Sequence, residues 1–366
     1  MNVESIRLIN FRNYHNLNIN LNKNINIFVG KNAQGKTNLL EAIYFCAMGK
    51  SFRTNRDKEI INFNKHEAYI GAKININKRE KIIEIKLEKD RPKRIKVNKI
   101  ELKNFKELNS GLNVVIFSPD DLKLIKDGPG ERRNFLDMSI SQIKPVYKYN
   151  INKYNKILFQ RNNLLKSNKP KSHIINLLEI FDIQLAKIGT EIIIYRIQFI
   201  ENLSKIAKEI HKKLTLEREE LNLNYNSNVN ISDKNIIEKK FLEQLKTNVD
   251  KDLITGITSI GPHRDDIQIQ INGIDARVFA SQGQQRTIVL SIKLSEVEII
   301  KMERGVYPVL LLDDVYSELD LDRRKYLTET FKDMQTIITS TDIINLDELK
   351  ELERSTFYIN NGKIIK

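Results

Sequence analysis

The stretch Gly30-Lys31-Asn32-Ala33-Gln34-Gly35-Lys36-Thr37 decides the fold of this 366-residue chain. It follows the apolar run 25–29, which predicts a buried strand, and precedes residues 38–47, which predict a helix. The pattern GxxxxGK[ST] between a strand and a helix is typical of a phosphate-binding loop. Its glycines let backbone N–H groups close around phosphate oxygens beside the positive end of the helix. We therefore expect ATP at residues 30–37, with Lys36 on the outer phosphates and the Thr37 hydroxyl on Mg²⁺.

The acidic strand end Val309-Leu310-Leu311-Leu312-Asp313-Asp314 is the expected partner of that loop. A buried strand that ends in an acid places a carboxylate beside the magnesium ion, which is the Walker B arrangement. Asp313 is predicted to hold Mg²⁺ together with Thr37, and Asp314 is predicted to orient the attacking water as a general base. Lys36, Asp313 and Asp314 are therefore the predicted catalytic residues.

The polar segment Ser281-Gln282-Gly283-Gln284-Gln285-Arg286 ends 23 residues before Val309. It is predicted to be a loop before a helix that begins near Thr287, and its small residues suit a close approach to phosphate. A phosphate loop, then a distant S-x-G-Q segment, then a Walker B strand is the motif order of ABC-type ATPases. In that class the S-x-G-Q segment completes the nucleotide site of a second subunit. Residues 281–286 are therefore predicted to act in trans, in a homodimer that forms on ATP binding.

Strand and helix patterns at both ends of the chain predict one α/β unit built from its first and last parts. Residues 67–100 alternate polar and apolar side chains, which predicts antiparallel hairpins with one solvated face. Strand patterns return at residues 267–271 and 309–312. We therefore expect one discontinuous head domain, made of residues 1–130 and 255–366.

The middle of the chain, residues 131–254, has a helical pattern and is predicted to be an inserted arm. One apolar stripe predicts a long helix over residues 182–213, and residues 167–170 separate it from an earlier helix. Such a stripe is more typical of a core or a coiled-coil seam than of a cofactor face. The Asn-rich residues 222–230 predict a loop, and a further helix is expected near residues 235–248.

The chain carries 61 Lys and Arg against 47 Asp and Glu, a net charge of +14. That excess favours an acidic partner, of which nucleic acid is the commonest. Residues 71–106 hold 13 Lys or Arg and 5 Asp or Glu, a net charge of +8 within the predicted hairpins. Lys93, Arg94 and Lys96 are the DNA-binding candidates in this patch. A solvated lysine-rich surface is the alternative, because the chain is rich in Lys, Asn and Ile together.

Cys46 is the single cysteine, which excludes an internal disulfide, and the five histidines lie at no metal-ligand spacing. We therefore expect no zinc site. The first residues carry no basic run followed by an apolar run, and no apolar stretch approaches the roughly 18 residues that a membrane span needs. A cytoplasmic location without membrane contact is predicted.

The motifs lie in segments that resemble the RecF family, compact bacterial relatives of the SMC and Rad50 ATPases. The matching segments run nearly end to end, at residues 10–14, 35–43, 50–53, 117–122, 132–137, 160–162, 261–266, 281–287 and 311–327. The resemblance implies an ABC-type P-loop ATPase head, with a mixed sheet and an antiparallel hairpin subdomain. It also implies that the inserted arm is a short antiparallel coiled coil, and that Arg12 belongs to the ATP-binding set.

The same resemblance implies an ATP-gated dimer that binds single-stranded DNA, gapped DNA and junctions. It further implies action with RecO and RecR in loading RecA, and a part in SOS induction. Two departures from the wider ABC pattern predict slow hydrolysis, used as a switch. Asp314 stands where most such ATPases have glutamate, and residues 339–342 carry no histidine after the next strand. No glutamine can be assigned to the Q-loop.

Two other protein classes share part of this pattern. An ABC transporter ATPase subunit has the three motifs, but has neither a long helical insertion nor a basic hairpin patch. A Rad50-like or OLD-type ATPase partner of a nuclease would need a long coiled coil or an acidic nuclease domain. The sequence predicts neither a long coiled coil nor an acidic nuclease domain.

Overall fold

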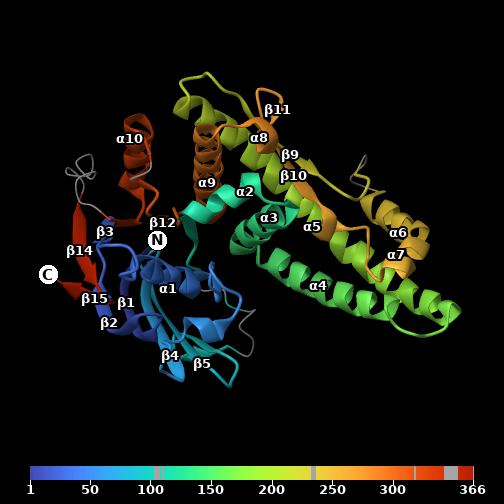
Figure 1. The fold of residues 1–366 in the computed structure, drawn as a ribbon, viewed down its shortest axis with the longest axis horizontal. Coiled ribbons are helices and arrows are strands. Elements are labelled where there is room, and N and C mark those ends of the chain that lie inside the picture. The colour runs from blue at the N-terminus through green and yellow to red at the C-terminus, as the bar shows by residue number, and fades with distance from the viewer. Residues whose placement is uncertain (103–107, 109–110, 232–235, 317–318, 342–352, 366) are drawn as a thin grey trace. The chain divides into compact units, whose positions relative to one another are not determined.

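The computed structural model describes residues 1–102, 108, 111–231, 236–316, 319–341 and 353–365 (Figure 1). The chain forms two compact units. The first comprises Met1–Asp121 with Glu296–Lys366, and the second comprises Leu122–Ser295. The boundary after Ser295 lies within helix α9 (Gln282–Arg304), so this helix contributes residues to both units.

The first unit contains a six-stranded sheet that carries the predicted phosphate loop at the end of one strand. Its strands, in sheet order, are β15 (Lys363–Ile365), β14 (Arg354–Asn360), β3 (Ile25–Val29), β13 (Thr336–Ser340), β12 (Val309–Asp313) and β8 (Val114–Phe117). Neighbours pair in parallel, except that β15 forms a hairpin with β14. Strands β3, β12 and β13 are buried along their whole length, as parallel strands covered on both faces should be.

The second sheet of this unit is antiparallel throughout and confirms the predicted hairpins. Its strands, in sheet order, are β2 (Tyr14–Asn20), β1 (Asn2–Phe11), β4 (Glu67–Ile76), β5 (Arg79–Glu88), β6 (Arg94–Val97) and β7 (Ile100–Glu101). The turns at residues 77–78 and 98–99 have positive φ at both positions, which is the type I′ geometry of two-residue hairpins. Ile83, Ile85 and Leu87 are buried in alternation along β5, so the sheet has one apolar face.

One helix of the first unit contacts strands of both of its sheets. Helix α1 (Lys36–Met48) follows the predicted phosphate loop and contacts β12, β13 and β8. It is apolar nearly all round, with buried residues from Leu39 to Ala47, because sheet and neighbouring strands cover most of its surface. The other helical elements described in this unit are η1 (Asp57–Ile60), α10 (Leu321–Thr330) and η7 (Phe331–Asp333), and η3 (Pro119–Leu122) ends at the first residue of the second unit.

The second unit is mainly helical. Its helices are α2 (Lys123–Lys126), α3 (Pro129–Ile143), α4 (Pro145–Leu165), α5 (Lys171–Leu214), α6 (Ile237–Thr247), α7 (Val249–Thr255) and α8 (Ala276–Phe279), with the short η5 (Pro262–Arg264). Helices α4 and α5 lie side by side and antiparallel (Figure 1), and the break predicted between them is confirmed. Helix α5 has 44 residues. It begins earlier than predicted because Ile174 and Leu178 extend the buried stripe.

Gly189 lies in the middle of α5, where glycine costs about 1 kcal/mol relative to alanine. Packing explains it, because a Cβ there would lie 3.2 Å from the Tyr154 ring of α4 and closer still to the Phe241 ring of α6. The missing side chain therefore lets three helices of the second unit approach one another.

The predicted loop at residues 222–230 is wrong over most of its length, because β9 (Leu221–Asn226) is a strand. Its asparagines alternate with the buried Leu221 and Leu223, and this alternation outweighs the low strand propensity of asparagine. β9 pairs with β10 (Asp266–Ile271), and β10 pairs with the short β11 (Ile274–Asp275). Residues 266–275 therefore lie in the same unit as residues 131–254. The domain limits expected from the sequence, 1–130, 131–254 and 255–366, stay a prediction.

Two fully buried arginines of the second unit bind acidic and carbonyl groups from other segments of that unit. Arg161 on α4 binds Asp182 and Asp252, with nitrogen–oxygen distances of 2.7 Å each. Arg196 on α5 binds Asp137 at 2.8 Å and the carbonyl oxygen of Pro262 at 2.6 Å. Removing one partner would leave a buried charge uncompensated, at a cost of about 3–5 kcal/mol. Segments 132–137, 160–162 and 261–266 thus carry groups that hold this unit together, namely the Asp137 and Arg161 side chains and the Pro262 carbonyl.

Candidate nucleotide site

The loop between β3 and α1 has the geometry that its sequence requires. Ala33 and Gly35 have positive φ values of 65° and 112°. A Cβ at Gly35 would lie 2.7 Å from the Asn13 side-chain amide, and a Cβ at Gly30 would lie 2.5 Å from the carbonyl oxygen of Ile359. Neighbouring parts of the first unit therefore leave no room for a side chain at either glycine.

Two turns brace this loop. The Asn13 side chain, between β1 and β2, donates to the carbonyl oxygen of Gln34 at 2.8 Å. The backbone N–H of Gly362, between β14 and β15, donates to the same oxygen at 3.0 Å. The N–H of Asn361 donates to the Gln34 side-chain oxygen at 2.6 Å. Asn13 lies in segment 10–14 but had no predicted role, and residues 361–362 were not among the predicted site residues, although Asn361-Gly362 is a turn signal.

Lys36 is the first residue of α1, and its side chain is only 4% exposed. Its Nζ donates to the carbonyl oxygens of Gly30 at 2.7 Å and Lys31 at 3.3 Å. The same Nζ lies 3.9 Å from the Asp314 carboxylate. The amine is thus held inside the curve of the loop, while Lys31, Asn32 and Ala33 are exposed along its rim.

Thr37 and Asp313 meet although 276 positions separate them in the sequence. The Thr37 hydroxyl donates to the Asp313 carboxylate at 2.8 Å, and the Thr339 hydroxyl donates to the same oxygen at 3.0 Å. Burial raises the pKa of Asp313, while these two hydrogen bonds oppose the rise. A hydroxyl oxygen beside a carboxylate oxygen fits Mg²⁺, which takes one or two protein ligands plus substrate phosphates. Among the described residues no three His, Cys, Asp or Glu side chains gather as a metal cage.

Asp314 follows β12 with a φ of 54°, in the left-handed region that non-glycine residues rarely occupy. Its N–H donates to the Thr339 hydroxyl at 2.9 Å, which turns its backbone away from the strand direction. About a third of the side chain is exposed, in contrast to the buried Asp313. The two neighbouring acids therefore have different surroundings, one enclosed and one open to water. Asp342, the last residue of segment 339–342, lies outside the described residues.

Arg12 makes contacts other than the predicted ones. Its Nε and Nη2 atoms donate to the buried Glu41 carboxylate at 2.9 and 2.6 Å, and Nη1 donates to the carbonyl oxygen of Glu59 at 2.7 Å. Ser51 also donates to Glu41, and Arg53 lies 3.6 Å from it. Arg12 is therefore bonded to a residue of α1, Glu41. Its place in the ATP-binding set stays a prediction.

The S-x-G-Q segment belongs to the second unit and differs from its prediction in one respect. Helix α9 begins at Gln282, so residues 282–286 form its first turns, and the helix does not begin near Thr287. Ser281, Gln282, Gly283 and Arg286 are exposed, whereas Gln285 is buried and donates to the carbonyl oxygen of Ala280. The polar composition suited a helix start as well as a loop, because serine is a preferred N-cap residue.

The three DNA-binding candidates have unequal surroundings. The Lys93 side chain is 8% exposed, lies 3.0 Å from the Asp57 carboxylate and covers the Phe45 ring. Arg94 is exposed but lies 3.3 Å from Glu88. Lys96 is exposed on β6, and the described part of the chain gives it no ion pair. The structure therefore leaves mainly Lys96, and partly Arg94, available to an outside anion.

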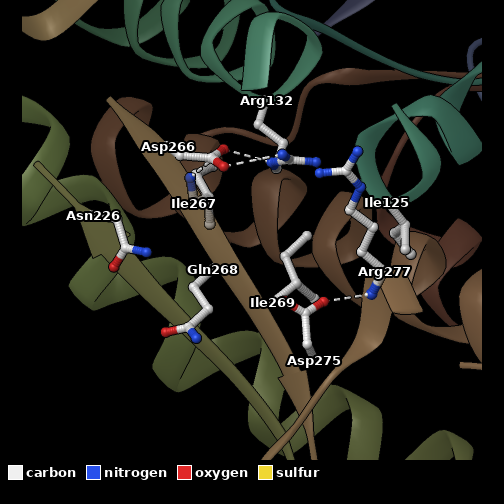
Figure 2. A pocket seen from close by; sticks show the side chains of 9 residues that line it. All are labelled: Ile125, Arg132, Asn226, Asp266, Ile267, Gln268, Ile269, Asp275 and Arg277. Atoms are coloured by element: carbon white, nitrogen blue, oxygen red, sulfur yellow. Dashed lines mark hydrogen bonds and ion pairs between the residues drawn. The ribbon is translucent and has the colours of Figure 1, made fainter. Parts of the chain in front are cut away.

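The second unit has a small pocket of about 130 Å³, lined by residues of α2, α3, α8, β9, β10 and β11 (Figure 2). Arg132 and Arg277 are the two basic residues of its lining (Figure 2). Arg132 is paired with Asp266 at 2.6 Å, and Asp275 caps α8 by accepting the Arg277 N–H at 2.8 Å. The opposite charges in its lining balance, so the pocket favours no class of ligand. None of the helices within the described ranges combines the length and the apolar character needed to cross a membrane.

Comparison with known proteins agrees with this architecture. Residues 2–362 match the family described as the RecF/RecN/SMC N-terminal domain. The chain is 49% identical to the DNA replication and repair protein RecF of Alkaliphilus oremlandii, over 100% of both chains. It is 46% identical to the protein of that name from Clostridium beijerinckii, over 100% of this chain and 98% of the relative.

Solved structures extend the comparison. The structure of a recombination mediator protein RecF with ATP superposes with a TM-score of 0.90 at 38% identity, covering 100% of this chain and 99% of the other. An SMC head bound to a winged-helix domain of ScpA has a TM-score of 0.58 at 18% identity, covering 100% and 97%. The second likeness concerns the fold alone, and together they confirm the predicted ABC-type ATPase head with a helical insertion. The chain belongs to the RecF family, within the wider RecF/RecN/SMC group.

Proposed function

We propose that this chain binds ATP with Mg²⁺ at residues 30–37 and hydrolyses it slowly. The observation that carries the proposal is the meeting of Thr37, Asp313 and Lys36 at the end of the parallel sheet, with the Thr37 hydroxyl 2.8 Å from Asp313. The solved RecF structure with ATP supports the same ligand.

Each of these side chains has one role in the proposal. Loop N–H groups from residues 30–36 surround the phosphates, and the Lys36 amine leaves the loop carbonyls for the outer phosphates. Thr37 and Asp313 hold Mg²⁺, which when bound neutralises charge on the phosphate oxygens. Asp314 orients the attacking water, because it is the open carboxylate nearest to Lys36.

Slow turnover follows from the residues around Asp314. An aspartate is one methylene shorter than the glutamate that most ABC-type ATPases have here, so it holds the water less well. Residues 339–341, at the end of β13 and directly after it, are Thr, Ser and Thr, so no imidazole assists from there. ATP binding then acts as a switch whose duration is set by hydrolysis.

The switch proposed is a homodimer in which residues 281–286 of one copy face the nucleotide of the other. Ser281, Gln282 and Gly283 are exposed at the start of α9, where first-turn N–H groups have no acceptor within the helix. A Cβ at Gly283 would find no atom closer than 4.0 Å, so no contact in the second unit requires glycine there. A phosphate brought by a second copy would use that space.

The proposed target is DNA, as single strands, gaps and junctions, with RecR and RecO as protein partners and RecA loading and SOS induction as the outcome. The family membership and the net charge of +14 support this. Lys96 and Arg94 are the residues proposed to meet phosphates, because they are the exposed candidates.

Replacing Lys36 tests the proposal. Lys36→Ala should lower ATP affinity by about 100-fold or more, because charge-assisted contacts to the outer phosphates disappear. Calorimetry with Mg-ATP measures the affinity, and an electrophoretic shift on gapped DNA with and without ATP measures the consequence. Lys36→Arg should still bind ATP but hydrolyse it poorly, because the charge remains and the geometry changes.

Lys65→Ala is the matched control, because it removes an exposed lysine of the same unit outside the site. Wild-type ATP affinity in Lys36→Ala would refute the nucleotide site. Wild-type DNA binding in a variant that has lost ATP would refute the switch.

A further inference from the structure

The start of α9 is a reciprocal capping box. Ser281 is the N-cap residue, and its hydroxyl accepts the N–H of Gln284 at 3.3 Å. The side-chain oxygen of Gln284 in turn accepts the N–H of Ser281 at 2.8 Å. Serine followed three positions later by glutamine is the sequence signature of this arrangement. The side-chain oxygens of Ser281 and Gln284 are therefore both used in shaping the helix start.

The other end of the Gln284 amide is also engaged. Its nitrogen donates to the Glu219 carboxylate at 2.9 Å. Because the oxygen faces the Ser281 N–H and the nitrogen faces a carboxylate, only one orientation of the amide satisfies both bonds. Gln284 is thus held from two sides and is not directed outward like Ser281.

Glu219 is itself held by a buried histidine. Its second carboxylate oxygen lies 3.2 Å from Nε2 of His211, which is fully buried in the last turn of α5. Nδ1 of His211 lies 3.0 Å from the Ser291 hydroxyl, two turns further along α9. The Ser291 hydroxyl also donates to the carbonyl oxygen of Thr287 at 2.8 Å, so its oxygen remains to accept from Nδ1 of His211. A continuous set of hydrogen bonds therefore joins the end of α5 to the start of α9.

We propose that Glu219 is a positioning residue for residues 281–286. It holds Gln284 in the capping box, so that the Ser281 hydroxyl hydrogen and the first N–H groups of α9 keep one outward geometry. This inference rests on the proposed shared nucleotide site, and it changes the role predicted for Gln284. Gln284 shapes the segment from behind and does not touch the nucleotide of a second copy.

The substitution Glu219→Gln tests this with little change of shape. The new amide at position 219 is neutral and has one oxygen where the carboxylate has two, so the hydrogen bond that Gln284 donates is either lost or no longer charge-assisted. Glu219 is a fifth exposed, and water can reach the separated groups, so the fold should survive. The capping box should loosen while the nucleotide loop of the first unit is untouched.

Two measurements separate positioning from general damage. Light scattering with ATP should show that Glu219→Gln needs about five- to tenfold more protein for half-maximal dimer, which is the effect of losing one capping interaction. Calorimetry should show unchanged ATP affinity of the monomer. Hydrogen exchange of the peptide covering residues 280–287, without nucleotide, should be faster than in the wild type.

The double variant Glu219→Gln with Gln284→Glu is the rescue. It exchanges amide and carboxylate, so the amide donates to the carboxylate, which still accepts the Ser281 N–H. Dimerisation and hydrogen exchange should return to within about twofold of wild type. Glu220→Gln is the matched control, because Glu220 lies in the same loop and pairs with Lys208, away from α9.

Wild-type hydrogen exchange and dimerisation in Glu219→Gln would overturn the role of Glu219. Failure of the double variant to recover, with the single variant impaired, would also overturn it, because the damage would not come from this hydrogen bond. A wild-type chain that stays monomeric with ATP would instead refute the shared site.

Discussion

The two glycine-containing segments proposed to meet at the nucleotide differ in what makes glycine necessary. At Gly30 and Gly35 the first unit itself leaves no room for a side chain, since a Cβ would lie 2.5 Å from Ile359 and 2.7 Å from Asn13. At Gly283 the nearest atom to a Cβ is 4.0 Å away, in Ser281. The phosphate loop is therefore shaped from inside the chain. The S-x-G-Q segment has open space on its outer side, as a surface that receives a partner must have.

The polar groups of the two segments follow the same division. Asn13 and Gly362 hold the backbone of Gln34 from two distant turns, and Glu219 holds the side chain of Gln284. In both places, the residues with internal partners set a shape and the groups without them face outward. Accounting for internal hydrogen bonds thus separates positioning residues from candidates for ligand contact.

Alanine substitutions at Gly35 and Gly283 should show the largest difference between the two segments. Gly35→Ala should lower ATP affinity by about 100-fold and reduce Tm by several degrees, because a side chain at φ 112° is strained and meets Asn13. Gly283→Ala should leave both quantities at wild-type values, but should weaken ATP-dependent dimerisation and hydrolysis. Calorimetry, thermal unfolding and light scattering give the three quantities. Normal dimerisation and hydrolysis in Gly283→Ala would remove the distinction between the segments.

Asp313→Asn measures how much the buried carboxylate of Asp313 lowers the stability of the folded chain. Burial raises the pKa of Asp313, which means that the folded state disfavours the charged carboxylate. The neutral amide should therefore raise the Tm of the nucleotide-free chain at pH 7, by roughly 2–4 °C for each kcal/mol recovered. Hydrolysis should be lost, because the proposed Mg²⁺ ligand is gone.

The sign of the pH dependence follows from the same shift. A folded pKa above the ordinary Asp value of 3.8 makes the wild type gain stability as the pH falls through that raised pKa. The Tm advantage of Asp313→Asn should therefore shrink on acidification and vanish below the ordinary value. A lower Tm for the variant at pH 7 would show that the hydroxyl hydrogen bonds outweigh the burial of the charge.

Two lysines of the hairpin sheet, Lys93 and Lys96, should differ by the smallest effect. Lys96→Gln should reduce the slope of log affinity for DNA against log salt by about 0.9, because one phosphate contact is lost. Lys93→Gln should leave the slope unchanged and lower Tm, because Lys93 is enclosed and paired with Asp57 at 3.0 Å. Equal slopes for wild type and Lys96→Gln would assign this patch to the solvated surface.

Local patterns predicted the parts of the fold that depend on near neighbours in the sequence. The phosphate loop, the buried Walker B strand, the hairpins of residues 67–100 and the break near residues 167–170 each depend on periodicity, glycine or proline within a few positions. The loop predicted at residues 222–230 failed because asparagine-rich composition hid a two-residue alternation. The start of α9 was misplaced because a polar segment suits both a loop and a capped helix start.

The amino-acid sequence alone predicted the phosphate loop and the acidic strand end, because GxxxxGK[ST] and an apolar run that ends in two acids encode backbone geometry and charge locally. Only the tertiary structure decided which polar groups remain available. It placed Arg12 on Glu41, Lys93 on Asp57 and Gln284 on Glu219, each a contact between segments far apart in the sequence. The physical reason is that a side chain's hydrogen-bond partner depends on packing between elements, and composition and spacing do not record that packing.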